Sequence, residues 1–101
     1  MDTMNTMEEQ IKIVCTEVET MLLIKNQSYG GIETPVNIFS KANAMEQICV
    51  RIDDKLSRLT RNGDDFPTED TELDLIGYLV LKKALCNLIK NQDDKGNKGV
   101  Y

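Results

Sequence analysis

The chain has 101 residues and a formal net charge of −5, from 17 acidic and 12 basic residues. This length suits one small domain, and the acidic balance opposes general binding to a nucleic-acid backbone. No apolar run approaches the roughly 20 residues that cross a bilayer, and the N-terminal segment lacks the basic start of a signal peptide. We therefore expect a cytoplasmic protein without a membrane span and without direct contact to nucleic acid.

Composition favours an all-α fold. Aromatic residues make up 5% of the chain, and there are 6 Gly and 2 Pro, too few for the turns of a β-sandwich. The chain has no histidine, which excludes the usual catalytic triads and argues against a zinc site. Its cysteines, Cys15, Cys49 and Cys86, are widely spaced, so we expect reduced thiols in the core.

The first predicted helix spans residues 7–25, where apolar residues recur every three or four positions. Thr6 and Glu9 stand at the spacing of a capping box, which marks its start. The second predicted helix spans residues 44–61 and opens with Asn43, again followed by a glutamate three positions later. Both helices therefore carry a start signal and one apolar face.

The third predicted helix spans residues 69–91, with Thr68 as its N-cap and acids in its first turn. Its apolar residues cover a wider arc than two neighbours bury, which indicates a central helix or a subunit interface. Gly77 in its interior indicates the close approach of another helix. The sequence predicts one small antiparallel helical bundle over residues 1–91, completed by homo-oligomerisation, and a flexible tail over residues 92–101.

The link between the first two helices, residues 26–42, is longer than a helical hairpin needs. It combines glycines with aromatic, amide and hydroxyl groups, which suit a planar polar ligand. In the alternative, Ile38 and Phe39 cover the core while the glycines only form turns. Composition does not choose between these two interpretations.

Four acids are candidate Mg²⁺ ligands. Asp70 and Asp74 are four positions apart on the third helix, and Glu46 and Asp53 are seven apart on the second, so each pair shares a helix face. If the two helices face each other, these carboxylates converge on a metal ion. In the alternative, the first-turn acids complement the helix dipole and the others are solvated or form salt bridges.

Arg51, Lys55 and Arg58 form a basic stripe on the second helix. Guanidinium forks and an ammonium group suit the oxygens of a di- or triphosphate. The alternative pairs Asp54 with Arg58 and leaves the other cations in water. Tyr78 on the third helix either turns its hydroxyl toward the same site or covers the bundle edge.

Four ordered segments give the chain a family resemblance. They are Lys25-Asn26-x-x-Tyr29-Gly30, Asn37-Ile38-Phe39, the run from Glu46 to Leu59 that includes Arg51, Asp54, Lys55 and Arg58, and Glu69-Asp70-x-x-x-Asp74-Leu75-Ile76-Gly77-Tyr78. Over about residues 20–85 the chain resembles the nucleotide modification associated domain 1 family, small proteins that are largely phage-borne or prophage-borne. Ser28 stands where that family usually carries an acid. The layout is also distantly similar to all-alpha nucleoside triphosphate pyrophosphohydrolases of the MazG kind, in which acids on paired helices hold Mg²⁺.

The resemblance implies a protein that binds a phosphorylated nucleotide, either a DNA precursor or a host immune signal that a phage protein sequesters. The candidate ligand-binding residues are Lys25, Asn26, Tyr29, Gly30, Asn37, Phe39, Arg51, Lys55, Arg58 and Tyr78. A second hypothesis is a Mg²⁺-dependent nucleotide pyrophosphohydrolase with Glu46, Asp53, Asp70 and Asp74 as metal ligands. A third is a helical interaction module that binds a partner protein through the spare apolar face of the third helix and holds no small ligand.

Overall fold

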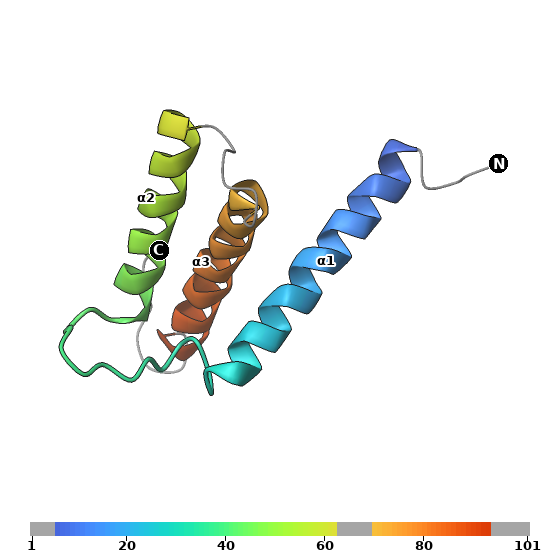
Figure 1. Ribbon diagram of the computed structural model, residues 1–101. Coiled ribbons are helices and arrows are strands. Elements are labelled where there is room, and N and C mark those ends of the chain that lie inside the picture. Colours follow the sequence, from blue (N-terminus) through green and yellow to red (C-terminus); the bar gives the residue numbers. More distant parts are fainter. Residues whose placement is uncertain (1–5, 63–69, 94–101) are drawn as a thin grey trace.

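The computed structural model describes residues 6–62 and 70–93, and these form three helices without a strand (Figure 1). Helix α1 spans Met7–Ser28, α2 spans Ala44–Asn62 and α3 spans Thr71–Asp93. The all-α, bundle-like fold predicted from the sequence is confirmed. The predicted tail lies outside the described residues from position 94 onward.

Helix α1 begins where its capping residue predicts and ends three residues later than expected. The Thr6 hydroxyl accepts the backbone N–H of Glu9 at 3.1 Å. At the other end, Gly30 and Gly31 adopt φ values of 70° and 111°, a region that favours glycine. The Gly31 N–H donates to the Asn26 carbonyl at 3.0 Å, so the chain leaves the helix only at this turn.

The capping box of α2 forms as predicted. The Asn43 side chain accepts the N–H of Glu46 at 2.8 Å, and the Glu46 carboxylate accepts the N–H of Asn43 at 3.2 Å. Helix α3 starts two residues later than predicted, because the Asp70 carboxylate accepts the N–H of Leu73 at 2.9 Å. Thr68, the cap expected from the sequence, lies outside the described residues.

The core lies between α2 and α3, which run antiparallel to each other (Figure 1). Ala44 and Ile48 of α2 are buried together with Leu85 of α3. Partly buried side chains surround this cluster: Ile32, Met45, Ile52, Leu81 and Ile89. Because the buried set is small, most of the hydrophobic stabilisation of the chain comes from this one helix pair.

Helix α1 packs against α3 alone. In the described part of the chain no Cα of α1 comes within 8 Å of one in α2, so α3 is the central helix. The contact is close at Gly77, where an added Cβ would lie 2.9 Å from the Met21 methyl carbon and 3.3 Å from a methyl carbon of Leu22. The predicted role of Gly77 in a close helix approach is therefore confirmed.

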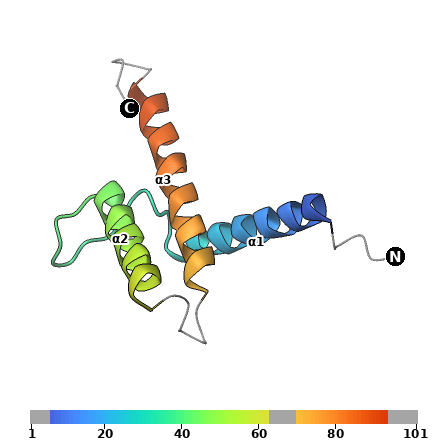
Figure 2. The ribbon, with the colours of Figure 1, turned by 90° about the horizontal axis from the view of Figure 1, so that it is seen from above.

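The N-terminal half of α1 is uncovered. The buried residues of this helix are Val18 and Leu22, and Figure 2 shows the helix projecting away from α2 and α3 toward its N-terminal end. Met7 and Ile11, which continue the same apolar stripe, are 76% and 55% exposed. The expectation that the three cysteines lie in the core is wrong: Cys49 and Cys86 are half-buried, and Cys15 is exposed because α3 covers only the C-terminal part of this stripe.

Among the described residues, none of the helices is long and apolar enough to span a bilayer. The three cysteines are free thiols. Link residues Gly31, Ile32, Pro35 and Val36 line a groove together with residues of all three helices.

Candidate functional site

A groove of about 400 Å³ lies where the C-terminal end of α1 and the link after it meet α2 and α3. This volume falls within the range of small-molecule sites. The polar side chains along it are those of Lys25, Tyr29, Gln47, Arg51 and Tyr78, and its other lining residues are apolar or glycine. Residues from all three helices and the link therefore form one hollow with a few polar groups.

The charge of this groove opposes that of the chain. Lys25 and Arg51 line it, and none of its lining residues is acidic, although the whole chain carries a net charge of −5. The Lys25 ammonium lies 5.3 Å from the centre of the Tyr78 ring, a cation–π contact that holds both side chains on this wall. Arg51 is exposed, and its guanidinium forms no ion pair within the described residues.

The link between α1 and α2 is held in place by amide side chains. The Asn26 side-chain oxygen accepts the N–H of Ile32 at 2.7 Å, which fixes the turn after α1. The Asn37 amide nitrogen donates to the Ala42 carbonyl at 2.7 Å, and its oxygen accepts a hydrogen bond from Gln47 at 2.7 Å. Asn26 and Asn37, predicted as ligand contacts, thus use their amides to shape the wall of the groove. Gly30 shapes it through its positive φ.

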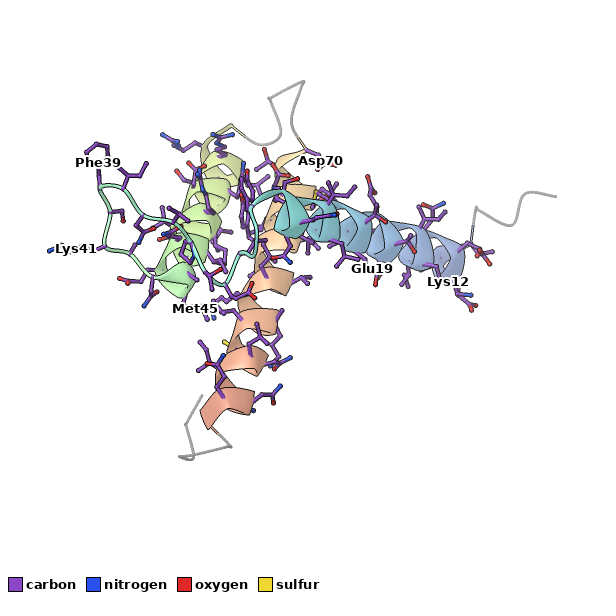
Figure 3. The ribbon with its side chains drawn as sticks, turned by 90° about the horizontal axis from the view of Figure 1, so that it is seen from below. Lys12, Glu19, Phe39, Lys41, Met45 and Asp70 are labelled. Atoms are coloured by element: carbon purple, nitrogen blue, oxygen red, sulfur yellow. The ribbon has the colours of Figure 1, made fainter. Side chains whose placement is uncertain are left out.

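The aromatic residues of the link and of α3 divide between two places. Tyr29 and Tyr78 both line the groove, and Tyr29 leaves 70% of its surface exposed. Phe39 is 96% exposed and lies at the outer end of the link, away from the helices (Figure 3). Ile38 is 83% exposed, so the alternative in which Ile38 and Phe39 cover the core is wrong. The tip of the link lies in solvent because the hydrogen bond between the Asn37 and Gln47 side chains holds the link against α2 and away from the core.

The three cations of the predicted basic stripe, Arg51, Lys55 and Arg58, lie in different environments. The Lys55 ammonium lies 3.3 Å from the Asp74 carboxylate, with the two side chains 11% and 27% exposed, so this pair joins α2 to α3. Arg58 pairs with Asp54 one turn earlier on the same helix at 3.5 Å, as the alternative predicts. Of the three cations, Arg51 is the one that lines the groove.

The four candidate metal ligands do not converge. Glu46 and Asp70 cap two different helices, Asp74 pairs with Lys55, and Asp53 is exposed on α2. Over residues 6–62 and 70–93 no group of three or more acidic or thiol side chains is close enough to hold a metal ion. Three of these acids therefore act as helix caps or as an ion-pair partner, and Asp53 faces solvent.

Gln47 is a groove residue that we did not predict from the sequence. It donates to the Asn37 side chain at 2.7 Å and to the Ala42 carbonyl at 3.0 Å. Its position four residues before Arg51 places both on the same face of α2, so the helical spacing was a usable signal. Gln47 thus connects the link to the cationic wall.

Comparison of the chain with protein-family models, with curated proteins and with solved structures finds no match.

Proposed function

We propose that this protein binds a phosphorylated nucleotide in the groove formed by Lys25, Tyr29, Arg51 and Tyr78. The observation that carries the proposal is the concentration of two cations and no acid in one hollow of an acidic chain. A phosphate group is a common cellular anion that a lysine and an arginine bind well together. The lysine supplies a point charge, and the arginine guanidinium donates two parallel hydrogen bonds.

The two tyrosines extend this assignment from a phosphate to a nucleotide. A nucleotide base is planar, and stacking on an aromatic ring contributes about 1 to 3 kcal/mol. Tyr78 is already oriented by the Lys25 ammonium, whereas Tyr29 stands exposed at the start of the link. The phosphate is expected between Lys25 and Arg51, and the base against the face of Tyr29.

The proposed biological setting follows the resemblance to the nucleotide modification associated domain 1 family. In a phage, a small nucleotide binder serves either by holding a DNA precursor or by sequestering a host nucleotide signal. Both uses require retention of an intact ligand rather than its turnover. The nature of the retained nucleotide distinguishes them.

The experiment incubates the purified protein with a pool of nucleoside mono- and triphosphates and cyclic dinucleotides, with and without Mg²⁺. Mass spectrometry then identifies what stays bound after buffer exchange and what is consumed in solution. We expect one intact species to be retained without Mg²⁺. Release of pyrophosphate from a triphosphate would instead show the hydrolase, and retention of nothing would contradict the proposal.

Lys25→Ala tests the cationic wall. Loss of a charge-assisted hydrogen bond costs about 1.5 to 3 kcal/mol, so affinity for the retained species is expected to fall at least about tenfold. Lys12→Ala is the matched control, because Lys12 lies on the same helix, pairs with Glu8 and is far from the groove (Figure 3). Equal affinity of the two variants in a calorimetric titration would remove Lys25 from the site.

A further inference from the structure

A second, apolar groove lies between α1 and α3. It has a volume of about 580 Å³ and is lined on one side by Val14, Val18 and Leu22 and on the other by Val80, Ala84 and Leu88. Val18 and Leu22 are buried at its base, whereas Val80 and Leu88 are 46% and 43% exposed. An apolar hollow of this size that stays in water is typical of a binding surface.

The apolar stripe of α1 runs beyond this groove. Met7, Ile11, Val14 and Val18 follow each other at intervals of four, three and four residues, a pattern that presents one continuous seam to a neighbouring helix. Val18 is buried and Val14 lines the groove, whereas Met7 and Ile11 lie beyond it and are 76% and 55% exposed. The seam therefore extends over about two further turns for which the chain itself supplies no cover among the described residues.

The helix segments that carry these two surfaces have opposite net charges. Residues 7–24 of α1 contain four glutamates and one lysine. Residues 75–93 of α3 contain three lysines, Lys82, Lys83 and Lys90, and one acid, Asp93. Within one chain the acidic end of α1 projects away from the basic end of α3 (Figure 2), so this complementarity is unused.

We propose that a second copy of this chain covers both surfaces. The acidic N-terminal half of α1 in one copy packs against the basic C-terminal half of α3 in the other, and a two-fold axis makes the exchange reciprocal. A homodimer of this kind is self-complementary, since each copy brings one surface of each charge. The charges and the apolar residues then both favour a second copy as the partner. The N-terminal half of α1 and the C-terminal half of α3 from each copy form a shared apolar core.

A first experiment measures the mass of the protein in solution by sedimentation over a range of concentrations. The wild type is expected to be a dimer, and Val14→Asp, which places a charge in the apolar groove, is expected to be a monomer with unchanged helix content by circular dichroism. Ile24→Asp is the matched control, because Ile24 is an exposed apolar residue of the same helix outside the groove. It is expected to remain a dimer.

A second experiment exchanges the charges of the two surfaces. One variant carries lysine at Glu8, Glu17 and Glu19, which flank the apolar seam of α1, and the other carries glutamate at Lys83 and Lys90, which flank the apolar face of α3. Each variant alone faces like charges across both contacts and is expected to be a monomer at low salt. Their mixture faces opposite charges across both contacts and is expected to form a one-to-one dimer.

Three results would overturn the proposal. They are a wild type that stays monomeric at every concentration, a Val14→Asp variant that dimerises as well as Ile24→Asp, and a mixture of charge variants that does not associate. None of these results bears on the cationic groove, so the proposed function is tested separately.

Discussion

Helices α1 and α2 both pack against α3, but with very different coverage. In α2 the buried side chains face one partner, and an ion pair from Lys55 to Asp74 joins the two helices. In α1 only Val18 and Leu22 are buried, although this helix carries more apolar residues than α2. The number of apolar residues in a helix therefore does not say whether the same chain covers them. A narrow apolar stripe suits one partner, whereas the broader distributions on α1 and α3 suit more than one.

The largest expected effect comes from the α2–α3 core. Ile48 is 4% exposed, and Ile48→Ala is expected to lower the free energy of unfolding by about 2 to 5 kcal/mol, because a cavity replaces its side chain. The same substitution on α1, Ile24→Ala, removes a side chain that is 60% exposed and is expected to change stability by less than about 1 kcal/mol. Urea denaturation measures both, and equal losses would contradict the unequal coverage.

The ion pair between α2 and α3 is expected to give an intermediate effect. Lys55→Met leaves the Asp74 carboxylate in a partly covered position without its ammonium and is expected to cost about 1 to 3 kcal/mol. Lys12→Met on α1 breaks a pair with Glu8 inside one exposed helix and is expected to cost about 0.3 to 0.5 kcal/mol. Adding Asp74→Leu to Lys55→Met is expected to recover part of the lost free energy of unfolding, because it removes the unpaired carboxylate. No recovery would show that the pair does not join the two helices.

The smallest expected difference is between two helix caps. Asp70→Ala removes the acceptor of the Leu73 N–H at the start of α3 and is expected to cost about 1 kcal/mol of global stability. Thr6→Ala removes the cap of α1, but the first turns of α1 bury no side chain, so it is expected to cost less and to increase local amide exchange instead. A larger global loss for Thr6→Ala would show that the start of α1 is covered.

Much of the fold follows from local signals in the sequence. The Thr6 and Asn43 caps fix the starts of α1 and α2, and Gly77 indicates the close approach of α1. The predicted start of α3 and the predicted end of α1 each differ from the structure by a few residues. The Asp70 carboxylate caps α3, and the turn at Gly30 and Gly31 ends α1. The exposure of Cys15 was not predictable, since spacing shows a helix face but not how far a neighbour covers it.

The candidate site was predictable only in part. Lys25 and Tyr29 at the end of α1, Arg51 on α2 and Tyr78 on α3 come from three separate segments, and the fold places them along one groove. The stripe of cations on α2 suggested that Lys55 shares this surface, but helical spacing does not distinguish a residue that faces solvent from one that faces the next helix. Such a distinction needs the packing of α3 against α2.

Arg51 is the groove cation whose loss bears most on nucleotide binding. Capture from the nucleotide pool is compared between the wild type, Arg51→Ala and Arg61→Ala, with the retained species quantified by mass spectrometry. Arg61 is an exposed cation of the same helix, outside the groove, so both variants remove one charge. Arg51→Ala is expected to retain at least about tenfold less nucleotide, whereas Arg61→Ala is expected to retain as much as the wild type. Equal retention by all three proteins would contradict this expectation.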